Sequence, residues 1–127
     1  MIDTSSSNQT PNAASGAIDL AVLYALLNIG GAEMRDELCA TLIADFDRLQ
    51  AEVAANQGPA LARSAHELKG LSATVGAKRL ADMARALDAV AATLPDAARV
   101  VMVSALDREM TVVRAALNAA ALGTSSE

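Results

Sequence analysis

The chain of 127 residues has a single cysteine, Cys39, and a single histidine, His66. One cysteine excludes an internal disulfide framework and any metal site built from several cysteines. One histidine excludes metal sites built from histidine clusters. Aromatic side chains make up only 2% of the residues, namely Tyr24 and Phe46, and there is no tryptophan. The chain therefore has no platform on which nucleic-acid bases could stack.

Basic residues are also scarce, because 10 Lys and Arg stand against 15 Asp and Glu and give a formal net charge of −5. A compact chain of this sign repels phosphates, which excludes a general nucleic-acid binder. No apolar run is long enough to span a membrane, and the N-terminus lacks the basic and apolar segments of a targeting signal. We therefore expect a cytoplasmic domain without a membrane partner, and the polar leader that begins at Met1 favours a stand-alone protein.

Alanine and leucine are abundant, with 30 and 16 copies, and both residues favour helix. A chain of this length forms one domain around one core. Apolar residues recur at steps of three and four, and no stretch alternates with a period of two. This spacing predicts helices over about 18–29, 32–56, 59–75, 78–92 and 96–122.

The predicted fold is all-α. Four long helices with short connections favour an antiparallel four-helix bundle, and the short additional N-terminal helix would close one end. Asp19 suits an N-cap, Pro59 a first helical turn and Gly76 a helix end. Residues 1–16 and 123–127 lack apolar periodicity and are predicted to be disordered, which leaves the bundle in residues 17–122.

The only histidine is predicted to point away from the core. Residues on a helix advance by about 100° each, and His66 lies about 140° from the centre of the apolar stripe of its helix. That position predicts an exposed imidazole. The stripe itself comprises Leu61, Ala65, Leu68, Ser72 and Val75.

Two neighbours of His66 are unusual. Gly70 lies inside the same predicted helix, where glycine costs about 1 kcal/mol relative to alanine. With Ala62 and Ala73 it would leave a bare strip beside the imidazole that another protein could approach, although tight helix packing is the other interpretation. Lys69, three residues after His66, can place its ammonium near the imidazole and offset a negative phosphoryl group.

The segment from His66 to Ser72, followed by Gly76 and Leu80, resembles the histidine-containing phosphotransfer (HPt) domain of multistep two-component relays. The family pattern is His-x-Leu-Lys-Gly-x-Ser/Ala, then a turn glycine, a leucine and a Leu-Glu pair on the next helix. Here Leu87 and Asp88 stand at the last pair, and Phe46 matches a frequent phenylalanine on the preceding helix. The resemblance covers about residues 18–122 and also implies a four-helix bundle.

The resemblance implies a role for each matching residue. His66 would be the phosphoacceptor, Lys69 would stabilise the phosphoryl group, and Gly70 would give the partner room. The position of Asp88 sometimes holds a residue that orients the imidazole, but the sequence leaves the choice between Asp88 and Arg85 open.

The implied function is that of a phosphorelay intermediate. It accepts a phosphoryl group from a receiver-domain aspartate onto His66 and passes it to another receiver-domain aspartate. The implied partners are response-regulator receiver domains or a hybrid histidine kinase. We expect a monomer without a cofactor of its own, because any Mg²⁺ would belong to the acidic pocket of the receiver.

Two alternatives remain at this point. The first alternative is a kinase-like dimerisation and histidine phosphotransfer domain, because residues 65–68 also resemble the start of the H-box in kinase dimerisation helices. The Thr/Asn-Pro pair that continues the H-box does not follow here. The chain has no glycine-rich loop and no room for an ATP-binding domain, so we expect a phosphoryl carrier without ATP-dependent kinase activity. The second alternative is a helical adaptor that binds another helix without phosphotransfer.

Overall fold

The computed structural model describes residues 16–125, and the predicted disorder of the first 15 and last two residues lies outside this range. The described residues form helices and no strand. None of the described helices is long and apolar enough to cross a membrane. The elements are α2 (Leu20–Leu27), α3 (Ala32–Ala55), α4 (Gly58–Val75), α5 (Lys78–Val90), the short 3₁₀ helix η1 (Ala91–Thr93) and α6 (Asp96–Ser125).

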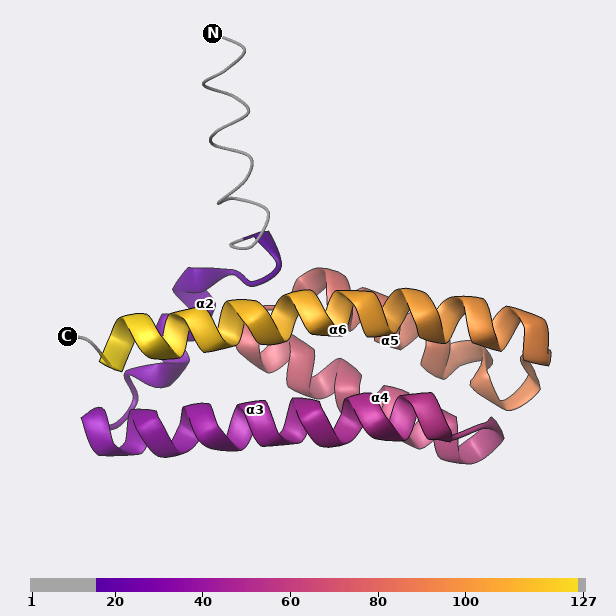
Figure 1. Cartoon of the computed structure of the whole chain (residues 1–127), viewed down its shortest axis with the longest axis horizontal. Helices are drawn as coiled ribbons and strands as arrows, with labels where there is room; N and C mark the ends of the chain where they lie inside the picture. The colour runs from indigo at the N-terminus through magenta and orange to yellow at the C-terminus, as the bar shows by residue number, and fades with distance from the viewer. Residues whose placement is uncertain (1–15, 126–127) are drawn as a thin grey trace, which may run out of the picture.

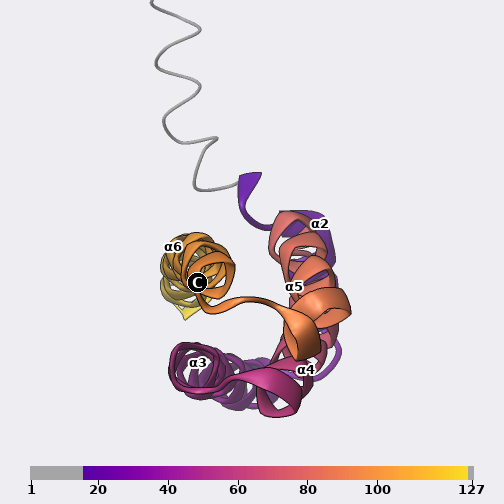
Figure 2. The same cartoon turned by 90° about the vertical axis from the view of Figure 1, so that its right-hand side faces the viewer.

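Helices α3, α4, α5 and α6 form an antiparallel bundle in which each runs opposite to its two neighbours (Figure 1). Seen end-on, they stand at the corners of a square in the order α3, α4, α5, α6 (Figure 2), and α2 packs against α4 and α3. The helices predicted from the sequence are all present, and α6 extends to Ser125, beyond the expected end near residue 122. The prediction of an all-α bundle is therefore confirmed.

The core fills the space between the four long helices. The apolar stripe predicted for α4 is buried along its whole length, and Phe46 of α3 is completely buried. Met34 lies four residues before Leu38 on α3 and is 52% exposed, so it does not join the buried face of that helix. It lies in the first turn of α3 and lines an open hollow with Leu26, Ile29 and Leu38 instead of packing in the core.

The segment before the bundle is joined to the turn between α4 and α5. The Asp19 carboxylate caps α2 by accepting from the backbone N–H groups of Ala21, at 3.0 Å, and Val22, at 3.4 Å. The Asp19 N–H donates to the carbonyl of Gly76 at 2.8 Å. Gly76 has a φ of 85°, and a Cβ there would lie 2.9 Å from the carbonyl oxygen of Asp19. Both the conformation and the close approach therefore require glycine.

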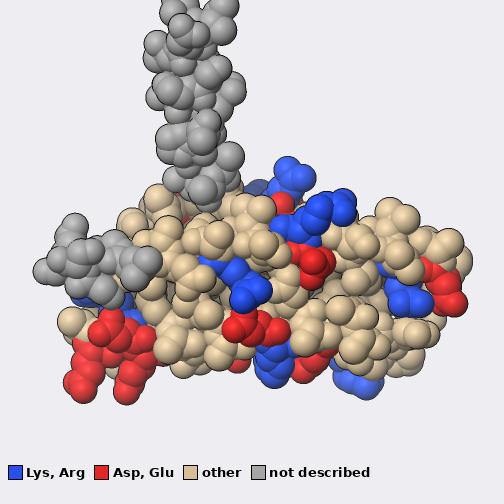
Figure 3. Space-filling model, in the orientation of Figure 1, with Lys and Arg blue, Asp and Glu red and all other residues tan. Residues whose placement is uncertain are grey.

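Charged residues of both signs lie interspersed over the face formed by α3 and α6 (Figure 3). Arg114 of α6 reaches Asp47 of α3 at 2.5 Å and donates to the side-chain oxygen of Gln50 at 2.6 Å. Gln50 in turn donates to the carboxylate of Asp107 at 2.8 Å. These contacts fix α6 along α3 on a face that carries no histidine.

A buried hydroxyl without a partner predicts a stabilising substitution. Ser72 of α4 is completely buried, and its Oγ has no hydrogen-bond partner in the described part of the chain. An unsatisfied buried polar group costs about 1–3 kcal/mol, so Ser72→Ala should raise the free energy of unfolding by about 1 kcal/mol or more. Urea unfolding followed by circular dichroism measures this change. The matched control is Ser104→Ala on the exposed face of α6, which gains helix propensity alone, and an equal gain in both variants would contradict the prediction.

Candidate functional site

The imidazole of His66 stands on the outer surface of α4. Its side chain is 69% exposed, whereas the neighbouring residues Ala65 and Leu68 are completely buried. The helical spacing that puts these two residues into the core turns His66 outward, as the angle calculated from the sequence predicts. The ring is therefore accessible to another protein.

A carboxylate from the next helix holds the ring. Nδ1 of His66 lies 3.1 Å from Oδ2 of Asp88 on α5, whose side chain is 26% exposed. An ionised carboxylate can only accept a hydrogen bond, so Nδ1 carries the proton in this contact. The other ring nitrogen, Nε2, then has a free lone pair that points away from Asp88. The arrangement gives one oriented nucleophilic atom at the surface.

Of the two candidate residues on α5, Asp88 contacts the imidazole and Arg85 does not form a hydrogen bond with it. Arg85, the other residue that the sequence left open, donates to Asp82 at 2.9 Å instead. Asp82 is shared with Lys78 at 3.6 Å. The contact of Asp88 with the ring depends on how α5 lies along α4, so the family resemblance made Asp88 a candidate without deciding between it and Arg85.

Gly70 and Lys69 lie within one turn of His66 on the same helix. A Cβ built on Gly70 meets nothing within 4 Å, so the glycine makes no tight contact with another helix. Ala73, one turn further on, is exposed as well. Lys69 is half-buried and has no ion pair or hydrogen-bond partner in the described part of the chain. The interpretation of Gly70 as a packing glycine is therefore wrong, and the surface beside the imidazole is bare.

A second contact at the site comes from α3. Glu67, which directly follows His66, pairs with Arg48 of α3 through both carboxylate oxygens. This pair could not be predicted from the sequence, because residues 19 positions apart on different helices share no local signal. The contact turns the carboxylate of Glu67 toward α3.

The other candidate groups carry no site. Cys39 is half-buried, and desolvation by burial raises the pKa of its thiol, which disfavours the thiolate that would act as a nucleophile. Within the described range, no group of three or more His, Cys, Asp or Glu side chains could hold a metal ion.

Comparison with known proteins identifies the family. The sequence profile of the Hpt domain matches residues 33–120, which includes α3, α4, α5 and most of α6. No curated protein sequence and no solved structure shows significant similarity to the chain. The matched range covers more than half of the chain and contains the exposed histidine, its carboxylate partner and the bare strip. The chain thus belongs to the Hpt domain family, whose members take part in phosphotransfer in two-component signalling and interact there with receiver domains and histidine kinases.

Proposed function

We propose that the protein is a phosphorelay intermediate that takes a phosphoryl group from the aspartate of one receiver domain onto His66 and delivers it to the aspartate of another. The observation that carries this proposal is the exposed imidazole whose Nδ1 is held by Asp88. A single oriented nucleophile on an accessible surface is sufficient for phosphoryl transfer, because positioning and electrostatics supply most of the catalysis.

The transfer step requires few groups of this chain. The lone pair of Nε2 attacks the phosphorus of the aspartyl phosphate, and the bond between phosphorus and the aspartate oxygen breaks, which releases the receiver's carboxylate. The ring keeps its proton on Nδ1 and gains positive charge, which Asp88 offsets across 3.1 Å. Delivery to the second receiver is the same step in reverse. Lys69 offsets the charge of the phosphoryl oxygens, and Gly70 allows the receiver to approach.

The proposal assigns no ATP-dependent step to the chain. The phosphoryl group arrives already activated as an acyl phosphate, and any Mg²⁺ needed for transfer belongs to the receiver. We place the reaction in the cytoplasm and propose that a monomer performs it, since one copy of α4 and α5 supplies His66, Lys69, Gly70 and Asp88.

The experiment that tests the function is a transfer assay. The protein is mixed with a receiver domain phosphorylated on its aspartate, and phosphate on the chain is measured after acid and after base treatment. A phosphohistidine is labile in acid and stable in base. Stable binding of the receiver without any transfer of phosphate would contradict the proposal and favour a helical adaptor.

Lys69→Ala should shorten the lifetime of the phosphorylated state without unfolding the bundle. A charge-assisted contact to an exposed phosphoryl group contributes about 1 kcal/mol, so we expect transfer to slow or the lifetime to fall by about fivefold. Time courses of phosphate gain and loss measure both quantities. Lys78→Ala, which removes an exposed lysine from the start of α5, is the matched control. Equal kinetics in Lys69→Ala and the unaltered protein would remove Lys69 from the mechanism.

Asp88→Ala should free the imidazole to rotate and to move its proton between the ring nitrogens. We expect phosphoryl acceptance to slow by about tenfold, because the attacking atom is no longer held in place. Asp88→Asn keeps an oxygen that can accept from Nδ1 and should retain more activity than the alanine variant. Nitrogen NMR of the single histidine reports the position of its proton. A proton that stays on Nδ1 in Asp88→Ala would show that the carboxylate does not set it.

A further inference from the structure

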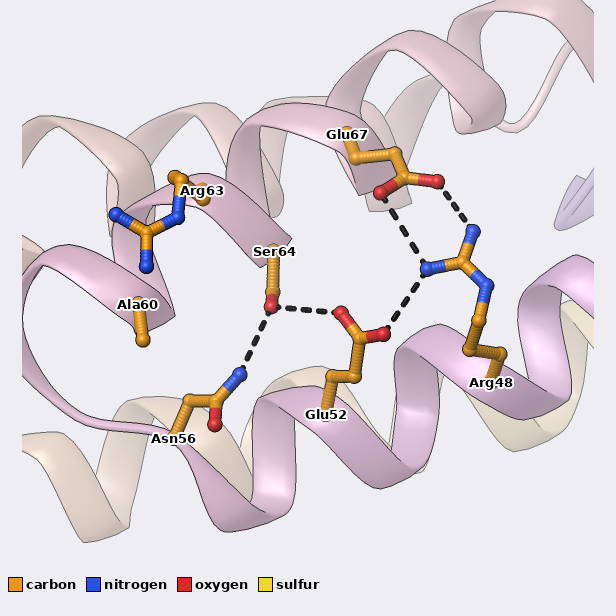
Figure 4. A pocket seen from close by; sticks show the side chains of 7 residues that line it. All are labelled: Arg48, Glu52, Asn56, Ala60, Arg63, Ser64 and Glu67. Atoms are coloured by element: carbon orange, nitrogen blue, oxygen red, sulfur yellow. Dashed lines mark hydrogen bonds and ion pairs between the residues drawn. The ribbon is translucent and has the colours of Figure 1, made fainter.

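A chain of polar contacts joins α3 to α4 beside the candidate site (Figure 4). Arg48 donates to Glu67 through both of its terminal nitrogens and to Glu52, at 3.0 Å, through Nη1. In Figure 4 the guanidinium lies between the two carboxylates and faces both of them. The hydrogen bonds from Arg48 therefore hold Glu67 on the side of α4 that faces α3.

The position of Arg48 is itself fixed by neighbours. Glu52 accepts a hydrogen bond at 3.0 Å from the hydroxyl of Ser64, a buried residue of α4, and Asn56 donates to the same hydroxyl at 3.2 Å. The hydrogen bonds from Arg48 and Ser64 lower the pKa of Glu52. Glu52 therefore stays ionised and remains paired with the guanidinium of Arg48. These groups line a polar groove of about 470 Å³.

In the described part of the chain, the carboxylates near His66 are paired, whereas two cations of the same helix are not. Glu67 pairs with Arg48, and Asp88 pairs with the imidazole. Two cations of the same helix, Arg63 and Lys69, lie three residues before and after His66 and have no ion pair among the described residues. Arg48 lies 3.8 Å from Asp45 as well, so its one positive charge is shared by three carboxylates. Of these three, Glu67 is the one that directly follows His66 in the sequence.

We propose that Arg48 is a positioning residue for phosphotransfer, because it ties the carboxylate of Glu67 to α3 and so keeps that negative charge from repelling the phosphoryl group at His66. The proposal rests on the proposed function. A phosphoryl group carries about 1.5 to 2 negative charges, and an unpaired carboxylate on the adjacent residue would oppose its arrival and shorten its stay. The carboxylate of Glu67 and the phosphoryl group both lie at the exposed surface. The expected change in the rate of phosphoryl acceptance is therefore a few-fold, and it decreases as salt screens the repulsion.

The experiment compares three variants with a small phosphoryl donor, phosphoramidate, on the full chain. Arg48→Gln should accept phosphate about fivefold more slowly at low ionic strength and less than about twofold more slowly in 1 M salt. Glu67→Gln, which removes the charge that Arg48 restrains, should be no slower than the unaltered protein. The double variant, with both substitutions, should recover the rate that Arg48→Gln loses. Arg114→Gln, which breaks the ion pair between α6 and α3 away from the site, is the matched control and should keep its rate.

The different rates expected of the two single variants separate an electrostatic role of the ion pair from a structural one. If the ion pair acts only by fastening α3 to α4, Glu67→Gln loses as much rate as Arg48→Gln, and the proposal is wrong. A double variant as slow as Arg48→Gln would assign the effect to the charge of Arg48 itself and would also overturn it. Failure of the proposed function gives a different result, namely no acid-labile phosphate on the unaltered protein or full labelling of a His66→Gln variant.

Discussion

His66→Gln should abolish phosphoryl acceptance and leave the stability of the bundle nearly unchanged. Glutamine has no ring nitrogen that can attack phosphorus, and the chain contains no second histidine that could replace it. The side chain is 69% exposed and makes one surface contact, with Asp88. Exposed ion pairs contribute about 0–1 kcal/mol, and surface substitutions usually change stability by less than about 0.5 kcal/mol. We therefore expect labelling to disappear while the thermal and urea unfolding curves stay in place.

Labelling by a phosphorylated receiver and by phosphoramidate tests this expectation, with unfolding measured on the same preparations. Loss of several kcal/mol of stability would indicate a histidine with a structural role. Acid-labile phosphate on the glutamine variant would exclude His66 as the acceptor. His66→Ala serves as a second variant, because it removes the side chain without adding a new polar group.

Gly70→Gln should block transfer from a receiver and preserve labelling by phosphoramidate. A Cβ at this position enters open space, so a glutamine side chain would project from the surface one turn from the imidazole. It would hold a docked protein away from Nε2, and a misplacement of about 1 Å can cost about 100-fold in rate. A small donor needs no flat surface and should still reach the ring. We therefore expect the rate from the receiver to fall by about 100-fold and the rate from phosphoramidate to change by less than about twofold.

Gly70→Ala is the matched control for this substitution. Because nothing contacts the glycine, alanine should raise the free energy of unfolding by about 1 kcal/mol through helix propensity, and transfer should largely survive. If Gly70→Gln lowers the transfer rates from the receiver and from phosphoramidate equally, position 70 acts on the geometry of the imidazole. If both rates are unchanged, the receiver docks elsewhere on the molecule.

The helices and the exposure of the histidine could be predicted from the sequence because their signals are local. The three-and-four spacing of apolar residues defines the buried face of α4, and it also places His66 outside that face. Pro59 at the start of α4 and the left-handed Gly76 at its end mark the helix boundaries by their backbone preferences. Each of these inferences needs only residues within one helix or one turn.

The contacts between helices could not be predicted in this way. Asp88 and Arg85 lie three residues apart on α5, so a shift of α5 along α4 by about 4.5 Å would bring Arg85 to the level of Asp88 beside the imidazole. The pairing of Arg48 with Glu67 likewise depends on the relative position of α3 and α4. That position is set by the packing of many core side chains, and no short motif encodes it.

The segment that precedes α3 has a consequence for fusing this module to other proteins. The family pattern begins at residue 33, yet Ile18, Leu23 and Leu27 are buried in the same core as the bundle. The hydrogen bond from Asp19 to Gly76 fastens this segment to the turn that follows the helix of His66. A fusion junction at residue 33 would empty four core positions, Ala17 among them, and would remove the hydrogen bond from that turn. A junction before Ala17 would keep the histidine together with all the core side chains that the described part of the chain supplies.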